Sequence, residues 1–95
     1  MSSKASYEEM NHRLALLCES LLQSLVQDPD EVSVKSSRRK LTILVSGQDR
    51  GLVIGRGGQN LRALEDALVL ASEYMPDSDP NYEIPSFEVR VNDSE

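Results

Sequence analysis

Four glycines and one arginine lie close together in an otherwise apolar stretch, and they are the residues of this chain best suited to binding chemistry. The stretch from position 51 to position 60 is Gly-Leu-Val-Ile-Gly-Arg-Gly-Gly-Gln-Asn. A glycine inside a helix costs about 0.5–1 kcal/mol relative to alanine, so this density predicts positive φ angles or close approach of another backbone. A tight turn beside a helix N-terminus attracts anions, and Arg56 adds a positive charge at its apex. The stretch is therefore suited to holding phosphate.

Two well-defined nucleotide-binding motifs are excluded by the spacing. A Walker P-loop requires Lys and then Ser or Thr after its last glycine, whereas Gly57 is followed by Gly58. A dinucleotide-binding fingerprint requires a third glycine at position 60, which is asparagine here. A structural interpretation, in which the glycines only allow a tight turn between two helices, stays open at this point.

Length and composition indicate one ordinary globular domain over residues 1–95. A length of 95 residues is too short for two domains. A composition of 39% hydrophobic and 27% charged residues excludes the disordered and disulfide-rich classes of protein. No run approaches 18 apolar residues and the N-terminus carries no hydrophobic signal segment, so we expect a cytoplasmic protein without a membrane span. We expect residues 1–5 and 93–95 to be flexible.

A single cysteine and a single histidine exclude several kinds of chemistry. Cys18 alone cannot form an internal disulfide, and with His12 as the only histidine it leaves no ligand set for zinc or iron. The two residues are six positions apart in a predicted helix, about 600° of rotation, and so lie on opposite sides. Cys18 is therefore predicted to be a core residue and His12 a solvated one. We expect no metal, no cofactor and no enzymatic activity.

The net charge of −6 conceals a strongly basic segment. Residues 35–62 carry seven basic residues and one acid, a net charge of +6, whereas residues 1–34 and 63–95 carry −4 and −8. A concentrated basic block is the electrostatic signature of a nucleic-acid-binding surface. Four of the basic residues surround the first predicted hairpin, either as a solubilising turn or as an extended nucleic-acid contact: Lys35, Arg38, Arg39 and Lys40.

The first predicted element is a long amphipathic helix over about 7–27. Ser6 and Glu9 have the spacing of a capping box, which satisfies the unpaired amides of a helix start. Apolar residues then recur at i, i+3 and i+4 and are predicted to face the core: Leu14, Leu17, Cys18, Leu21, Leu22 and Leu25. A coiled-coil seam is the alternative, which the short length and the lack of ordered flanking charges disfavour.

The remainder predicts two strands, two helices and a third strand. Val32 and Val34 alternate with polar residues and indicate an edge strand, and the apolar run 41–45 indicates a buried central strand. Ser46 and Asp49 predict the start of a short helix that ends at Gly55.

A longer helix follows, from about 58–60 to Pro76, with six residues on one face: Leu61, Leu64, Ala67, Leu68, Ala71 and Met75. An acidic, proline-rich loop spans 76–85, and alternation over 87–91 predicts the last strand. A right-handed crossover places this strand parallel to the second one, with the helices on one face of the sheet.

The glycine motif and the element order resemble those of a known family. The stretch 53–58 resembles the I-G-x-x-G motif of KH domains, and the order α-β-β-α-α-β is that of the type II, or prokaryotic, KH fold, an α+β fold with a three-stranded mixed sheet. Asp28 and Pro29 before the first strand, and Asp49 and Gly51 after the second, are similar to the small bacterial single-KH RNA-binding proteins of the KhpA type. The resemblance extends over about 14–91.

This resemblance implies a platform for about four unpaired RNA nucleotides, whose sugar-phosphate backbone the glycine loop holds. The implied site consists of the clamp Gly55, Arg56, Gly57 and Gly58, the groove-lining Ile54 and Leu61, and the flanking Arg50 and Arg62, which steer phosphate or are ordinary solvated arginines. It also implies a post-transcriptional regulator or RNA chaperone, and a dimer with a second copy or with another KH-containing protein. The alternative is a dimerising KH-fold adaptor with weak or lost RNA binding.

The sequence departs from the family pattern in two places. Gln59 stands where many relatives have a basic residue, and the acidic loop corresponds to the variable loop beside the groove of type II KH folds. Asp77, Asp79 and Glu83 in this loop are expected to oppose an RNA strand that passes close to them.

Overall fold

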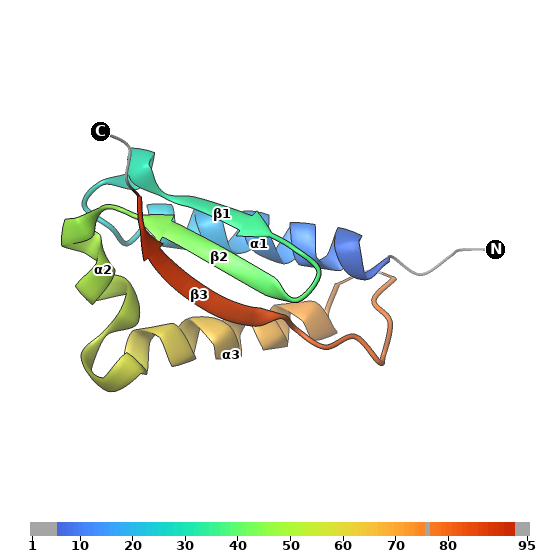
Figure 1. The fold of residues 1–95 in the computed structure, drawn as a ribbon. Coiled ribbons are helices and arrows are strands. Elements are labelled where there is room, and N and C mark those ends of the chain that lie inside the picture. The colour runs from blue at the N-terminus through green and yellow to red at the C-terminus, as the bar shows by residue number, and fades with distance from the viewer. Residues whose placement is uncertain (1–5, 76, 93–95) are drawn as a thin grey trace.

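The computed structural model describes residues 6–75 and 77–92, which form helices on one side of a three-stranded sheet (Figure 1). In chain order the elements are α1 (Tyr7–Gln23), β1 (Ser33–Ser36), β2 (Lys40–Val45), α2 (Gly47–Ile54), α3 (Gln59–Glu73) and β3 (Ser86–Val91). Single 3-10 turns span Pro29–Glu31 and Arg56–Gly58. The ends that we expected to be flexible, 1–5 and 93–95, lie outside the described residues. None of the described helices is long and apolar enough to cross a membrane.

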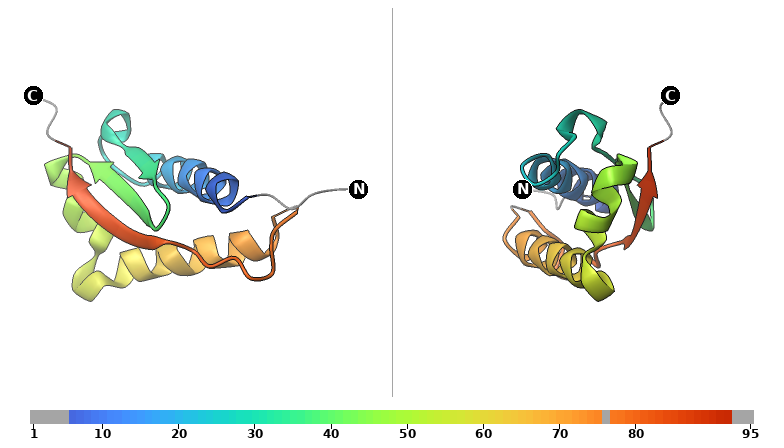
Figure 2. Two further views of the ribbon diagram at one scale, coloured as in Figure 1. Left: turned by 45° about the vertical axis from the view of Figure 1, so that its right-hand side comes forward. Right: turned by 90° about the vertical axis from the view of Figure 1, so that its left-hand side faces the viewer.

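The sheet is mixed, as the sequence predicts. Its strand order is β1-β2-β3, with β1 antiparallel to β2 and β3 parallel to β2. Ile43 in the central strand lies opposite Val34 on one side and Val89 on the other. Helices α2 and α3 form the connection between the two parallel strands, and Figure 2 shows α1 and α3 side by side on one face of the sheet while the other face stays uncovered. This confirms the predicted α+β architecture.

The core lies between the sheet and the helices. Alternate residues of β2 point into it, so that Leu41, Ile43 and Val45 are fully buried while Lys40 is exposed. The core is completed by Met10, Leu14, Ala15, Cys18, Leu22, Val32, Val53 and Leu68. Burial raises the pKa of the Cys18 thiol to about 12, so that it stays protonated. Cys18 is therefore a core residue, and His12 is exposed, both as predicted.

Helix α1 begins as predicted but buries a narrower stripe. The Ser6 hydroxyl accepts a hydrogen bond from the Glu9 amide at 3.1 Å, which completes the capping box. The buried positions of α1 include an i, i+4 ridge that packs on the sheet: Met10, Leu14, Cys18 and Leu22. The prediction that the other three leucines are core residues is wrong, because the sheet and α3 do not cover their side of the helix. Leu17, Leu21 and Leu25 are 36%, 38% and 67% exposed.

The end of α1 also differs from the prediction. The helix stops at Gln23, four residues before the expected end, and the Leu25 amide donates to the Leu22 carbonyl in the tighter pattern of a final turn. The next amides leave the helix, since those of Gln27 and Asp28 donate to the carboxylate of Asp49. Local periodicity cannot reveal a competing acceptor that lies 22 positions further along the chain.

Candidate nucleic-acid interface

Residues 55–58 form a turn between α2 and α3 whose two middle residues are exposed, and three of its four residues have positive φ. The φ angles are 76° at Gly55, 62° at Gly57 and 79° at Gly58. The structure thus shows the left-handed backbone that the sequence predicts for this part of the motif. Gly51 is different: it lies within α2, its φ is not positive, and a Cβ there would meet no atom within 4 Å. The expectation of a conformational requirement was therefore wrong at Gly51.

Asn60, in the first turn of α3, stabilises the glycine turn. Its Nδ2 donates to the Leu52 carbonyl at 2.6 Å, which connects α3 to α2 across the turn. A Cβ at Gly55 would lie only 2.6–2.9 Å from atoms of Asn60, so the backbone of Gly55 approaches this residue more closely than any side chain allows. Sequence reasoning missed this contribution because it considered position 60 only as a missing glycine. An asparagine two positions after the last glycine of the turn was the available signal.

Asp49 fixes where α2 begins. The side chain is 1% exposed, and its carboxylate accepts hydrogen bonds from the Gln27 amide at 3.0 Å and the Asp28 amide at 2.9 Å. The Ser46 hydroxyl donates a third bond to it at 3.0 Å, so the predicted helix start is correct although Ser46 does not itself cap a backbone amide. These bonds, above all that from the Gln27 amide, hold the pKa of Asp49 below its usual value against the opposing effect of burial.

The start of α3 is open to an anion. Gly58 occupies the N-cap position and supplies no side chain, and no acidic residue lies in the first turn. The amides of a helix start carry partial positive charge and attract negative groups. Arg56 and Gly57 are exposed directly beside this helix start, so the turn combines an uncapped helix terminus with a formal positive charge.

The other predicted site residues have different surroundings. Arg50 on α2 and Arg62 on α3 are exposed, and among residues 6–75 and 77–92 neither forms an ion pair with a carboxylate. Ile54 and Leu61 are half-buried, and Leu61 packs against the core. Their assignment to a base-binding groove stays a prediction.

The basic segment is divided between two ends of the molecule. The glycine turn lies at the N-terminal end of α3, whereas the β1–β2 hairpin lies beside the loop that follows α3, on the other side of Figure 1. Only the part of the segment near the turn adds to the charge of the predicted clamp.

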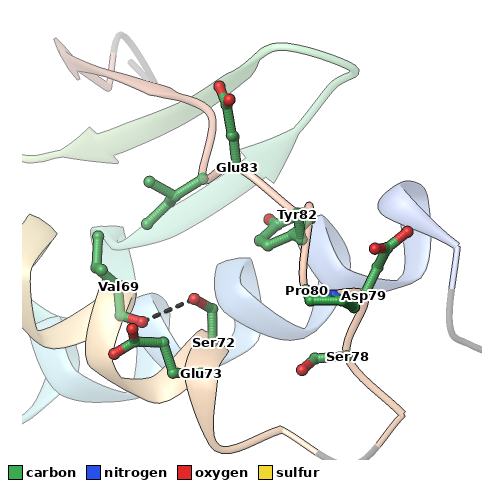
Figure 3. A pocket seen from close by; sticks show the side chains of 9 residues that line it. Val69, Ser72, Glu73, Ser78, Asp79, Pro80, Tyr82 and Glu83 are labelled. Atoms are coloured by element: carbon green, nitrogen blue, oxygen red, sulfur yellow. Dashed lines mark hydrogen bonds between the residues drawn. The ribbon is translucent and has the colours of Figure 1, made fainter.

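The acidic loop lies at the C-terminal end of α3. Together with Glu73 and neighbouring residues it lines a hollow of about 640 Å³, and Figure 3 shows Asp79 and Glu83 around it with Tyr82 between them. The hollow is lined on α3 by Val69, Ser72 and Glu73, so about 16 Å of helix separate its nearest residue from the glycine turn. That distance exceeds the screening length of about 8 Å in physiological salt, so the loop carboxylates do not oppose a phosphate at the turn itself.

The fold and the glycine turn define a KH domain of type II. The family described as KhpA/KhpB, KH domain, matches residues 16–74, a span that runs from α1 through the turn and the whole of α3. The chain belongs to this family. Comparison with curated proteins gave no match, and comparison with solved structures gave none.

Two glycines provide a matched test of the turn geometry. Gly55→Ala is expected to lower the melting temperature by several degrees, because a side chain at φ 76° is strained and its Cβ would overlap Asn60. Gly51→Ala is expected to raise it, because alanine gains about 0.5–1 kcal/mol in a helix interior where nothing blocks the Cβ. Thermal unfolding followed by circular dichroism measures both; equal effects of the two substitutions would contradict the assigned geometry.

The pKa of Asp49 predicts a pH dependence of stability. Because the folded-state pKa lies below the usual value of 3.8, the carboxylate contributes stability at neutral pH that is lost as the pH falls through the folded-state pKa. Asp49→Asn is expected to lower the free energy of unfolding at pH 7, with the difference from wild type shrinking below about pH 4. Urea titrations at several pH values measure this, and Asp66→Asn, at an exposed position of α3, is the control that should change little.

Proposed function

We propose that this protein binds single-stranded RNA by holding its sugar-phosphate backbone on the turn 55–58. The observation that carries the proposal is the turn with positive φ at three glycines, which presents the exposed Arg56 beside the uncapped start of α3. Membership of the KhpA/KhpB KH family supports the same conclusion, since KH domains clamp about four nucleotides with this loop.

The composition limits how the bases are held. Only 4% of the residues are aromatic, so stacking on rings supplies little of the affinity at the turn. With roughly three phosphates engaged, we expect micromolar affinity and a salt dependence of log K with a slope of about −2. We propose that Ile54 and Leu61 line the groove and that Arg50 and Arg62 attract the strand.

We further propose that the protein is a cytoplasmic post-transcriptional regulator or RNA chaperone and not an enzyme. Its one thiol is buried and protonated, and its one imidazole is exposed elsewhere on α1, so this pair supplies no activated nucleophile.

The RNA-binding proposal is tested at the turn. Arg56→Asp with Gly57→Asp places two negative charges where phosphate binds and is expected to abolish binding of a single-stranded RNA tetramer in fluorescence titrations. Both sites are exposed, and aspartate tolerates the φ of 62° at Gly57, so circular dichroism should stay unchanged.

The matched control is Arg56→Lys with Gly57→Asn, which keeps the charge and the shape and should retain binding within a few-fold. Wild type should also prefer the single strand to a perfect duplex. Undiminished binding by the doubly acidic variant would show that the clamp has been assigned to the wrong residues.

A second function, dimerisation as an adaptor, is favoured by an apolar groove on the helical side. The groove has a volume of about 420 Å³ between α1, α2 and α3, and Leu21, Leu25 and Leu52 at its rim are 38%, 67% and 47% exposed. The buried Leu22 and Val53 line the groove as well, as do the exposed Ala63 and Ala67. A two-fold interface places the same face of both copies in contact, so that the projecting leucines of one copy can enter the groove of the other. We therefore propose a second copy of this chain as its occupant.

This second proposal predicts a change in oligomeric state. Leu25→Glu with Leu52→Glu should convert a dimer into a monomer in light scattering after size-exclusion chromatography, because two buried carboxylates at each side of the contact are costly. Leu16→Glu is the matched control, since Leu16 is 54% exposed but lies outside the groove lining. A wild-type protein that is monomeric at high micromolar concentration would overturn the proposal without affecting RNA binding at the turn.

A further inference from the structure

The end of the molecule remote from the glycine turn contains a second basic hollow. Its volume is about 460 Å³, and it is lined by Tyr7 at the start of α1, Arg38 and Arg39 at the tip of the β1–β2 hairpin, and residues 83–86. We call it the Tyr7 hollow. It shares Glu83 and Ile84 with the hollow beside α3, so the two depressions adjoin one another on the surface.

The two arginines of the Tyr7 hollow are available for an anion. Both are exposed, and no carboxylate among residues 6–75 and 77–92 forms an ion pair with either one. Lys40 and Arg90 on the neighbouring strands are different, because both bind the Glu88 carboxylate, at 3.0 Å and 2.7 Å. Among residues 6–75 and 77–92, Arg38 and Arg39 thus keep an unpaired positive charge at the hairpin tip.

The backbone that carries these arginines is held by three hydrogen bonds from two neighbouring segments. Asn11, which is buried on α1, donates to the Ser37 and Arg38 carbonyls at 3.1 Å and 3.3 Å. The Arg39 carbonyl accepts from the Ser86 amide at 3.1 Å. A rigid tip reduces the entropy lost when its side chains bind a ligand.

The aromatic ring of the hollow is held in place as well. The Tyr7 hydroxyl donates to the Asn81 carbonyl at 2.7 Å, and the ring meets that of Tyr82 edge to face with 5.1 Å between centroids. Tyr82 in turn donates to the Asn11 side chain, which connects the ring pair to the hairpin. Tyr7 nevertheless stays 45% exposed. A fixed, exposed tyrosine beside two arginines matches the base and the phosphate of one nucleotide.

We propose that the Tyr7 hollow is a second nucleotide subsite, in which Arg38 and Arg39 bind phosphate and Tyr7 stacks a base of the RNA strand that the glycine turn holds. The inference rests on the proposed function, because it assigns the part of the strand beyond the clamp. Since α3, about 22 Å long, runs from the turn to the loop that lines this hollow, we expect a 12-nucleotide strand to reach the subsite and a tetramer held at the turn not to reach it.

Glu83 is the carboxylate that opposes this ligand, since it lines the same hollow. Its neutralisation by Glu83→Gln is expected to strengthen binding of the long strand about threefold at low salt and to leave the tetramer unchanged. Asp77→Asn is the matched control, because Asp77 lies in the same loop but lines neither hollow.

The decisive experiment compares two single-stranded RNA lengths, 4 and 12 nucleotides, on the full chain by fluorescence anisotropy. Arg38→Ala with Arg39→Ala should weaken the 12-mer about tenfold, lower its salt slope by about 1.4, the value for two phosphates, and leave the tetramer unchanged. Arg38→Lys with Arg39→Lys keeps both charges and should bind the 12-mer within about threefold of wild type. Tyr7→Phe keeps the ring and should bind normally, whereas Tyr7→Leu should weaken only the 12-mer.

The outcomes separate this inference from the proposed function. Unchanged 12-mer affinity in the double alanine variant overturns the subsite and leaves the clamp intact. An acidic peptide serves as a second probe in this case: if it binds wild type but binds the double alanine variant more weakly, the hollow is a protein-binding site. Equal losses for both lengths also overturn the subsite, since they indicate general attraction. If wild type binds the 12-mer in an Arg38- and Arg39-dependent way but no tetramer, the clamp fails, and the proposal of a subsite for a strand held at the turn fails with it, although the hollow itself binds RNA. If wild type binds neither length, both proposals fail.

Discussion

The buried carboxylate of Asp49 is the constraint on which the arrangement of this domain depends. It accepts the amides of Gln27 and Asp28, which leave α1, and the hydroxyl of Ser46, which precedes α2. One side chain therefore ends the first helix and places the second. Since α2 leads directly into the glycine turn, the position of the turn relative to the sheet follows from a carboxylate that is itself buried. A charge with three donors around it is stable where an unpaired one would be costly.

The electrostatic design of the molecule separates its charges in space. The chain carries a net charge of −6, yet exposed arginines lie at the glycine turn and at the hairpin tip, at opposite ends of α3. The acidic residues of the loop after α3 lie nearer to the hairpin tip than to the turn. An acidic protein therefore presents two basic points, and screening at physiological salt allows each to act within its own neighbourhood.

Two asparagine side chains form hydrogen bonds that connect separate segments, one at the glycine turn and one at the hairpin tip. Asn60 bonds α3 to α2 across the glycine turn, and Asn11 bonds α1 to the hairpin and to the loop that carries Tyr82. An amide group is suited to this because it donates and accepts without carrying charge. The sequence context of Asn11 does not predict its partners, since they lie 26 to 71 positions away.

The sequence by itself determined the element order, the capping box at Ser6, the mixed sheet and the glycine turn, because periodicity and turn chemistry are local properties. Only the tertiary structure decided which of the predicted leucines are buried, where α1 ends, and at which position no residue larger than glycine fits. It also decided that Tyr7 lies beside Arg38 and Arg39. Each of these depends on a neighbour supplied by a distant segment, such as Asp49 for the helix end and Asn60 for Gly55. Contacts of that kind arise from packing, which no local pattern encodes.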